Sequence, residues 1–443
     1  MAKDQIDTAA SPVTIAIIGA GHRGRTYAGY ALEYPHLAKV VAVAEPSKHR
    51  RTAMATKHSI PEAMQFAQWK DLFAHGEVHG NVADCVVIAV MDQLHAEAVA
   101  DFAAKGYHIL CEKPMATSIG ECVAMVRKVL AVEEPKVFGI GHVLRYSPYN
   151  RAIKEVIESG ALGEIINIQH IEPVGNEHFS HSYVRGAWRK ESESSFALMA
   201  KCCHDIDILS FYLSGLKPTR VHSFGSIGHF KKSRKPAAAG EARNCLDCAY
   251  EPDCIWSAKR IYVDRLSEPG VQWASLFVDA DVLDVENVTE ALRTTSYGNC
   301  VYESDNDVVD HQVVNIEYEG GVTASMTMSA FTEAICDRGT RIQGTKGELV
   351  GDMVSFDVFD FQTRTKTHHT PVLEGGYHGG GDTGLARAFV AAVAQKDQAR
   401  LGVTPDDILT SHLLVFAAER SRLEGHVVDF AEFRASCEDR ASM

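Results

Sequence analysis

The sequence has 443 residues, 46% of them hydrophobic, and its formal net charge is -14. A chain of this length can bury a large core and is expected to form two domains. Its negative charge excludes general binding to nucleic acid or to an anionic membrane surface, because both would repel it. The longest apolar runs have the length of strands and fall far short of the roughly 18 to 20 residues of a membrane helix, so no transmembrane span is expected.

The N-terminal segment and the cysteines indicate the compartment. Residues 1–11 combine charged and small residues without an apolar stretch, so we expect a loose leader rather than a secretory signal. The eleven cysteines are odd in number and spread along the chain. Such a distribution is typical of reduced thiols and not of a disulfide framework. Both features predict a cytoplasmic protein.

The first part of the chain alternates short apolar runs with helical stretches. This alternation predicts an α/β domain over residues 12–141, with a doubly wound parallel sheet of the Rossmann type. The expected strands are 13–18, 39–44, 84–90, 108–111 and 136–140, and the expected helices are 23–33, 48–57, 93–105 and 119–132.

Residues 142–443 have a different pattern, which predicts an α+β domain. Strands with alternating apolar residues are expected to form an open antiparallel sheet with one free face. A basic, alanine-rich stretch at 231–240 is expected to be a flexible loop that opens an insertion, from about residue 230 to 302. The expected strands are 165–171, 311–318, 322–329, 341–344, 348–351 and 355–359, and the expected helices are 148–159, 200–213, 383–394 and 405–423.

A glycine-rich turn follows the first expected strand. The run Gly19-Ala-Gly21-His-Arg-Gly24 lies between that strand and a helix, the context in which glycines let a dinucleotide pyrophosphate approach a helix N-terminus. Glu45 ends the next strand, where an acid can bind the adenosine ribose and repel the extra phosphate of NADP. Arg50 and Arg51 follow, but they are expected on the solvent side of the next helix. The turn therefore predicts a dinucleotide site that prefers NAD.

Further motifs follow in a characteristic order. Glu112-Lys113-Pro114 comes after the fourth expected strand, and Trp188-Arg189 precedes a helix that carries His204 and Asp207. With the glycine turn, these motifs resemble the glucose-fructose oxidoreductase / inositol dehydrogenase / MocA family over about residues 12 to 430. The resemblance implies a Rossmann domain plus an open antiparallel sheet, with the cofactor between them and sugars or polyols as substrates.

The resemblance also implies which residues carry the chemistry. Lys113 is expected to reach the reacting hydroxyl, and His204 matches a histidine that the family pairs with an aspartate four residues earlier. That earlier position is Ala200 here, and Lys201 stands beside it. Because hydride removal from a carbinol requires a proton acceptor, repulsion between Lys201 and Lys113 could lower an ammonium pKa and make a better base. Asp207, on the same helix face, could orient the His204 ring; the alternative is a core histidine with Lys201 in water.

Two sets of binding residues are expected. The cofactor set comprises Gly19, Gly21, His22, Arg23, Gly24, Glu45, His95, Glu112, Lys113 and Arg189. The substrate set begins where the second domain starts and continues through residues 170–190, a segment without periodicity that we interpret as a loop. Its aromatic side chains could stack on a sugar and its arginines could bind an anion, although a solvated basic loop is the alternative. The substrate set comprises His142, Arg145, Tyr146, His178, His181, Tyr183, Arg185 and Trp188.

Three functions are compatible with these features. An NAD-dependent dehydrogenase would release the oxidised sugar. A glycoside hydrolase of the same family would use the C3 ketone transiently, lose the anomeric substituent, add water and recover the hydride. The surplus of His, Lys and Tyr and the missing aspartate favour hydrolysis slightly. A cofactor-sensing regulator without catalysis is the third reading, and the presence of Lys113 and His204 argues against it.

Two further expectations concern the substrate and the assembly. A set of basic residues suggests an anionic sugar, such as a sulfosugar or a uronic acid. We also expect a homodimer or homotetramer, because the open sheet face would otherwise expose a large surface and resembling proteins pair there. The basic residues are Arg145, Arg185, Arg189, Lys190 and Lys201.

Three cysteines in the insertion have the spacing of a metal site. Cys245-x2-Cys248-x5-Cys254 is close to the thiolate knuckles that hold structural zinc, for which four ligands are usual. Cys300, in a Gly-Asn-Cys turn, is the candidate fourth ligand, with Cys203 and His229 in reserve. An iron–sulfur cluster and a set of free thiols are the alternatives.

Overall fold

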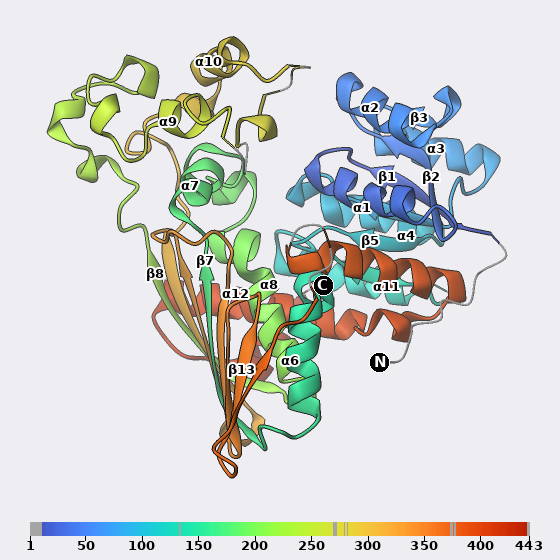
Figure 1. Ribbon diagram of the computed structural model, residues 1–443. Helices are drawn as coiled ribbons and strands as arrows, with labels where there is room; N and C mark the ends of the chain where they lie inside the picture. The colour runs from blue at the N-terminus through green and yellow to red at the C-terminus, as the bar shows by residue number, and fades with distance from the viewer. Residues whose placement is uncertain are drawn as a thin grey trace.

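Two sheets with their helices organise the molecule (Figure 1). The computed structural model describes residues 11–132, 134–268, 273–278, 280, 282–372, 375 and 378–440. All but the last residue of the expected leader lies outside these ranges.

The N-terminal sheet is parallel and has the strand order β3-β2-β1-β4-β5-β6. The expected doubly wound parallel sheet is therefore confirmed. The order reverses between β1 and β4, the place where such sheets bind ligands at the carboxyl ends of their strands. The strands are β1 (Val13–Ile18), β2 (Ala38–Ala44), β3 (Gln65–Phe66), β4 (Cys85–Ile88), β5 (His108–Cys111) and β6 (Phe138–Ile140), and the helices are α1 (His22–Glu33), α2 (Lys48–His58), α3 (Trp69–His79), α4 (His95–Ala104) and α5 (Ile119–Leu130).

The second sheet has nine strands in the order β14-β13-β12-β11-β7-β10-β9-β8-β15. Only the pair β7–β10 is parallel among the pairs described, so the expected antiparallel sheet is confirmed. The strands are β7 (Ile165–Pro173), β8 (Pro218–Ser226), β9 (His311–Tyr318), β10 (Thr323–Ser329), β11 (Gly339–Gly344), β12 (Gly347–Gly351), β13 (Phe356–Asp360), β14 (Lys366–His369) and β15 (Val428–Asp429).

Helices of the second part cover one face of this sheet and also contact the Rossmann domain. α8 lies against β7 and β10, and α12 packs on α8 and β8. α11 packs on α1, whereas α12 and α13 pack on α5. A single hydrophobic core therefore includes residues from both sheets. The longer helices are α6 (Pro148–Glu158), α8 (Ala197–Tyr212), α11 (Gly381–Gln395), α12 (Pro405–Glu424) and α13 (Phe430–Arg440).

Two segments expected to be loops contain regular structure. β7 extends to Pro173, and α7 (Asn176–Phe179) continues into a π-helical turn over Ser180–Arg185. All six side chains of that turn are buried, so the interpretation of residues 170–190 as a loop is wrong. The stretch 231–240 contains short 3-10 turns at Lys232–Arg234 and Ala237–Ala239.

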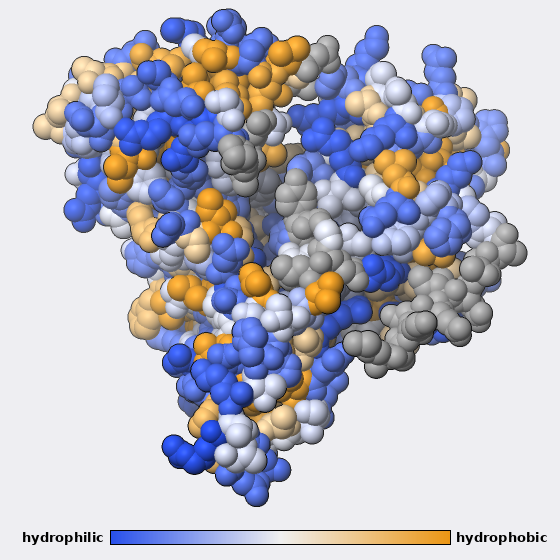
Figure 2. Space-filling model, in the orientation of Figure 1, coloured by the Kyte–Doolittle hydropathy of each residue, from blue (hydrophilic) through white to orange (hydrophobic). Residues whose placement is uncertain are grey.

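The insertion between β8 and β9 forms its own lobe (Figure 1). It contains α9 (Ala258–Tyr262) and α10 (Val285–Thr294), and it has a small core that includes Trp273 and Leu292. In the space-filling view the surface is indented between this lobe and the Rossmann domain (Figure 2). No helix in the described part of the chain is both long and apolar enough to cross a membrane.

Candidate active site

The glycine turn joins the carboxyl end of β1 to α1. Gly19 has a φ of +92°, and a Cβ there would lie 2.4 Å from the Ala89 carbonyl oxygen. A Cβ on Gly24 would lie 1.9 Å from the Gly19 carbonyl oxygen, so the fold itself requires both glycines. A Cβ on Gly21 would meet no described atom within 4 Å. No side chain caps the N-terminus of α1, which leaves open space and backbone N–H groups for a pyrophosphate.

Glu45 lies against this turn, at the end of β2. Its carboxylate accepts hydrogen bonds from the backbone N–H groups of Ala20 at 2.7 Å and Ser47 at 2.9 Å. The side chain is therefore fixed beside the site where an adenosine ribose would lie. Arg51 does not point into solvent as expected, because its Nη1 donates to the Glu45 carbonyl oxygen at 2.5 Å.

Lys113 reaches from the turn after β5 to the first turn of α8. Its Nζ donates to the carbonyl oxygen of Ala200 at 2.6 Å. A backbone carbonyl thus binds the ammonium at the position where the resembling family has an aspartate. His95 supports this turn from behind, because its Nδ1 lies 2.7 Å from the Pro114 carbonyl oxygen and its Nε2 lies 3.2 Å from that of Val90. Both ring nitrogens of His95 therefore contact backbone carbonyl oxygens.

His204 is buried on α8, and its Nδ1 has no hydrogen-bond partner among the described residues. Burial, followed by the positive charge of Lys113, holds the pKa of His204 well below its usual range. Its ring is therefore neutral near neutral pH and can accept a proton. The ring centroid of His142 lies 6.2 Å away, and that of His378 lies 5.5 Å away.

His378 and Asp382 are site residues that the sequence interpretation missed. The Nδ1 of His378 lies 3.0 Å from the Asp382 carboxylate. Asp382 is bound by Arg23 at 2.5 Å, and Arg23 also donates to Glu112 at 2.7 Å. Burial lowers the pKa of His378 although Asp382 raises it. A chain of charged contacts thus connects the glycine turn, the residue before Lys113 and the second histidine of the site.

Asp207 does not orient His204, contrary to expectation. Arg145 donates two hydrogen bonds to its carboxylate, at 2.6 and 2.7 Å, and the Nδ1 of His142 lies 3.0 Å from it. Although burial alone raises the pKa of Asp207, Arg145 and His142 lower it strongly. Asp207 is therefore a buried anion that positions His142, and His142 stacks on His412 at 5.0 Å.

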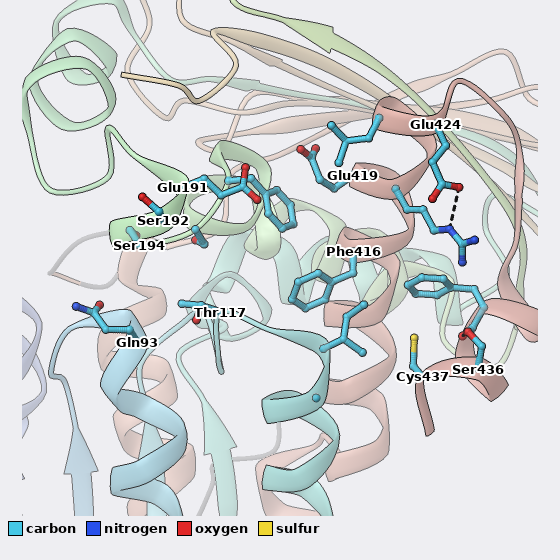
Figure 3. Close-up of a pocket in the computed structure, with 17 residues that line it drawn as sticks. Gln93, Thr117, Glu191, Ser192, Ser194, Phe416, Glu419, Glu424, Ser436 and Cys437 are labelled. Carbon is cyan, nitrogen blue, oxygen red and sulfur yellow. Dashed lines mark hydrogen bonds and ion pairs between the residues drawn. The ribbon is translucent and has the colours of Figure 1, made fainter. Parts of the chain in front are cut away.

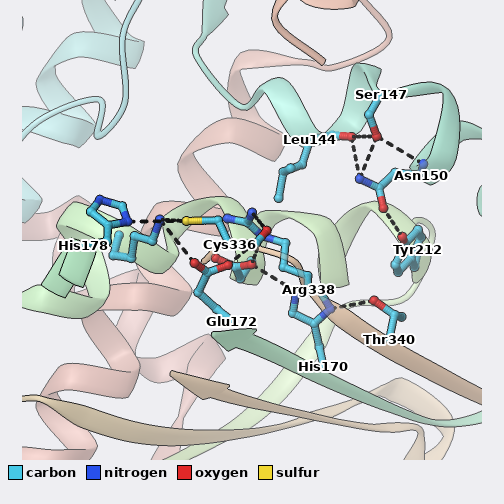
Figure 4. Close-up of polar contacts among 12 residues, drawn as sticks. Leu144, Ser147, Asn150, His170, Glu172, His178, Tyr212, Cys336, Arg338 and Thr340 are labelled. Carbon is cyan, nitrogen blue, oxygen red and sulfur yellow. Dashed lines mark hydrogen bonds and ion pairs between the residues drawn. The ribbon is translucent and has the colours of Figure 1, made fainter. Parts of the chain in front are cut away.

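Lys201 is buried and belongs to a charged cluster that includes Glu172. Glu172 and its neighbours Cys336 and Arg338 are labelled in Figure 4. The Nζ of Lys201 lies 3.2 Å from Glu172 and 2.9 Å from the Sγ of Cys336. Burial alone lowers the pKa of Lys201, but Cys336 and Glu172 raise it well above its usual range. The interpretation of Lys201 as an amine with a lowered pKa is therefore wrong. It is a fixed cation that can stabilise negative charge but cannot accept a proton near neutral pH.

Arg338, the residue immediately before β11, completes this cluster. Its Nε lies 2.7 Å from Asp205 of α8 and 2.8 Å from Glu172 of β7. His170 bridges Asp205 and Thr340, at 3.0 and 2.9 Å. Figure 4 labels His170 and Glu172, both of β7, together with Arg338. The cluster joins α8, which carries Asp205, to β7 of the sheet.

Some residues of the predicted substrate set lie around the site. His142 borders His204, and burial followed by Lys201 lowers the pKa of His178 well below its usual range. His178 also stacks on Trp273 at 5.2 Å. The Nε1 of Trp188 donates to Asp92, just beyond β4, at 3.0 Å. Among these contacts, the hydrogen bond of Trp188 joins the second domain to the Rossmann domain.

Others are used in packing. Tyr146 donates its hydroxyl to the Leu401 carbonyl oxygen at 2.8 Å, and Tyr183 stacks on Phe179 at 5.1 Å. His181 contacts the Tyr262 hydroxyl at 3.0 Å, beneath the insertion. Tyr146, His181, Tyr183 and Arg185 are all buried, and their side chains make contacts within the protein, so a role in substrate binding stays a prediction for them.

The basic residues do not form a free anion site. Arg145 binds Asp207, Lys201 binds Glu172, and Arg189 lies 2.8 Å from Asp305. Lys190 lies 3.7 Å from the same aspartate, and Arg185 faces the insertion. Four of these five cations are paired with a carboxylate and Arg185 is bound by backbone carbonyl oxygens, so the charge argument for an anionic sugar is not supported.

A cavity of about 760 Å³ lies behind the site, between α5, α12 and α13 (Figure 3). Gln93, Thr117, Glu191, Phe416 and Glu419 are among its lining residues. Neither Lys113 nor His204 lines it. This cavity is therefore separate from the catalytic candidates.

The predicted metal ligands lie together, but not as a ready-made metal site. Cys245, Cys248, Cys254 and Cys300 line one small cavity in the insertion. Within the described ranges, no group of three or more His, Cys, Asp or Glu side chains is arranged to hold a metal ion, so the zinc prediction is not confirmed. Of the reserve ligands, Cys203 is buried on α8, and His229 accepts a hydrogen bond from Trp256 at 2.9 Å.

The chain is similar to known proteins over most of its length. The GFO_IDH_MocA family model, an oxidoreductase family with an NAD-binding Rossmann fold, matches residues 13–142. The model of that family's C-terminal alpha/beta domain matches residues 154–430. A levoglucosan dehydrogenase structure in complex with NADH and levoglucosan has a TM-score of 0.68 at 19% identity, and the match covers 95% of this chain and 100% of that chain.

Two curated relatives match only part of the chain. The chain is 27% identical over 218 residues to 2,7-anhydro-N-acetylneuraminate hydratase of Escherichia coli strain K12, a match that covers 49% of this chain and 54% of that protein. It is 26% identical over 170 residues to inositol 2-dehydrogenase of Corynebacterium glutamicum strain R, covering 38% of this chain and 48% of that protein. The chain thus spans about half the length of these two relatives. Because the models of both domains match in the expected order, the chain belongs to the GFO_IDH_MocA family of NAD-binding oxidoreductases.

Proposed function

We propose that this enzyme removes a hydride from the C3 carbinol of a pyranoside and uses the resulting ketone for redox-neutral hydrolysis of the glycoside. The observation that carries the proposal is the position of Lys113. The Lys113 ammonium is held at the Ala200 carbonyl of α8. Burial and, after it, the charge of Lys113 lower the pKa of the neighbouring His204 ring. The ammonium can donate a hydrogen bond to a hydroxyl oxygen, and the uncharged imidazole can accept the proton of that hydroxyl.

The residues of the glycine turn fit a dinucleotide. Gly21 leaves open space, the N-terminus of α1 carries no side-chain cap, and Glu45 lies beside the turn. When bound there, NAD would accept the hydride and later return it. Arg23 binds Glu112 and Asp382, so it fixes the turn relative to Lys113 and His378.

The surplus histidines support hydrolysis over simple oxidation. Once C3 is a ketone, the proton on C2 is acidic and a base must remove it as the aglycone leaves from C1. Water then adds at C1, a proton returns to C2, and the hydride returns to C3. This sequence needs proton transfers at two further positions, and His378, held by Asp382 and 5.5 Å from His204, offers a second imidazole.

The relatives support both this function and its alternative. The name of the hydratase describes addition of water to an anhydro sugar, which is the water-addition half of the proposed cycle. Inositol 2-dehydrogenase supports a plain dehydrogenase. A regulator without catalysis has less support, because Lys113 and His204 are brought to one place.

We propose that the enzyme acts in the cytoplasm.

Turnover per NAD distinguishes hydrolysis from oxidation. The enzyme is given an aryl glycoside and an amount of NAD that is sub-stoichiometric to the glycoside. Release of the aglycone is followed together with absorbance at the NADH wavelength. Many aglycones per NAD, without accumulation of NADH, support the redox-neutral cycle. Product that stops at one equivalent of NADH contradicts hydrolysis and leaves a sugar dehydrogenase.

Glu45 is expected to set the preference for NAD over NADP. Its carboxylate repels a ribose phosphate, so Glu45→Ala should narrow the ratio of the two dissociation constants by about tenfold, the equivalent of about 1.4 kcal/mol. Glu45→Gln is the matched control, because it removes the charge and keeps an oxygen that can accept from Ala20. Titration calorimetry with both cofactors measures the ratio. Tighter binding of NADP by the unmodified protein contradicts the role of Glu45.

The open sheet face is expected to pair two copies of the chain. Phe224 of β8, Val313, Thr327 and Ile171 form one row across four neighbouring strands, and Phe224 is 64% exposed. An apolar row of this kind favours association. Light scattering should therefore give an even number of chains, and Phe224→Asp should shift the mass to the monomer. Val78→Asp, at a 77% exposed valine of α3, should leave the mass unchanged, and a monomeric wild type contradicts the proposal.

A further inference from the structure

Four thiols surround one cavity in the insertion, far from any role in the proposed reaction. Cys245, Cys248, Cys254 and Cys300 line it together with Trp256 and other residues. The cavity is only about 10 Å³ in volume, close to the minimum for one water molecule. It therefore excludes an organic ligand and leaves room for a single ion.

The backbone brings these cysteines together from distant positions. Cys245 begins a 3-10 turn, and the N–H of Cys248 donates to the Cys245 carbonyl at 3.3 Å, which places the two thiols on one knuckle. Cys254 directly follows a second 3-10 turn, over Glu251–Asp253. The N–H of Cys300 donates to the Arg243 carbonyl at 2.7 Å, and Asn244 pairs with Asn299. The fourth cysteine is thus fixed beside the knuckle by main-chain contacts.

Arg185 adds an unusual charge next to the thiols. Its side chain is fully buried, and its hydrogen bonds go to the carbonyl oxygens of Asn299 at 2.8 Å and Trp256 at 2.6 Å. Its Nη2 also lies 3.6 Å from the Sγ of Cys245, and its Nη1 has no hydrogen-bond partner among the described residues. No carboxylate within the described ranges forms an ion pair with it. A buried guanidinium is costly without a counter-charge.

We propose that the four cysteines bind one zinc ion as thiolates. Four S–H groups release their protons to solvent and bind Zn²⁺, so the centre carries a formal charge of -2 without any change of oxidation state. Arg185 offsets part of that charge, which explains a buried cation beside sulfur atoms. Because the thiols line the cavity without converging on one point, zinc binding draws them inward. An iron–sulfur cluster, with its bridging sulfides, is too large for this cavity.

The metal content of the full-length protein tests the site. Protein expressed with both zinc and iron in the medium is purified without chelators and analysed by mass spectrometry of the elements. We expect about one zinc per chain and negligible iron. Iron with inorganic sulfide overturns the zinc assignment, and protein with neither metal overturns the site.

Single substitutions assign the ligands. Cys248→Ser and Cys300→Ser should each reduce zinc to a small fraction of the wild-type content, while Cys122→Ala, at a buried thiol of α5, should retain it. Cobalt substitution of the wild type provides a readout that does not depend on the variants folding, because tetrahedral Co²⁺–thiolate sites have characteristic visible absorbance. Zinc retained in both serine variants, or cobalt bound without thiolate absorbance, contradicts the proposal.

Discussion

Replacing Lys113 with alanine is expected to lower turnover by about 10² to 10⁴, the contribution typical of a general acid–base group. The ammonium is held 2.6 Å from the Ala200 carbonyl, so its loss removes the amine from the reacting hydroxyl without disturbing the glycine turn. NAD affinity should stay close to that of the wild type. Steady-state kinetics and cofactor titration on the same preparation measure both quantities.

Two further variants define the specificity of this effect. Lys105→Ala is the matched control, because Lys105 pairs with Glu77 on the surface of the same domain and should leave turnover unchanged. His204→Asn should lose activity to a similar extent as Lys113→Ala, since it removes the neutral ring. Turnover by Lys113→Ala within about twofold of the wild type would exclude a catalytic role for this lysine.

Replacing Arg338 with methionine is expected to lower the free energy of unfolding by about 3 to 5 kcal/mol, because it leaves buried carboxylates without their partner. Arg338 lies 2.7 Å from Asp205 and 2.8 Å from Glu172, and all three side chains are at most 1% exposed. Lys201 remains beside Glu172, but Asp205 retains only His170 as a charged or hydrogen-bonding side-chain partner among the described residues. Urea unfolding with linear extrapolation measures the change.

Arg341, three residues after Arg338 in the sequence, provides the control for this prediction. Arg341 lies on β11 with half of its side chain exposed, 3.5 Å from Glu348. Because surface ion pairs contribute only about 0 to 1 kcal/mol, Arg341→Met should have a small effect. If Arg338→Met and Arg341→Met lowered the free energy of unfolding equally, the buried cluster would contribute no more to stability than an exposed ion pair.

The sequence predicted the elements whose signal is local. β1, β5 and β9 have the bounds that their apolar runs predicted, and the glycine turn lies where its strand and helix indicated. The segment 170–190 was misread because its side chains pack against the insertion, which burial in the folded chain reveals and periodicity does not. The short strand β3 has only two residues, too few to show an alternating pattern.

The candidate site was predicted in part for the same reason. Lys113 and His204 belong to recognisable motifs, but His378 reaches His204 from a segment 174 positions later in the chain. The i,i+4 spacing of His378 and Asp382 at the start of α11 was the only local signal of that pair. The charge of Lys201 depends on Glu172 and Cys336, which come from distant parts of the chain. Long-range ion pairs of this kind cannot be derived from spacing.

Rapid mixing of substrate with the NAD-loaded enzyme tests the central claim most directly, namely that the site at Lys113 and His204 transfers a hydride between a ring carbon and NAD. A glycoside that the enzyme turns over is mixed with enzyme carrying bound NAD, and absorbance at the NADH wavelength is recorded during the first turnover. We predict a rise whose amplitude is limited by the bound NAD, and no rise with Lys113→Ala. Product formed at the same rate by enzyme freed of NAD, without any absorbance change, would contradict the account.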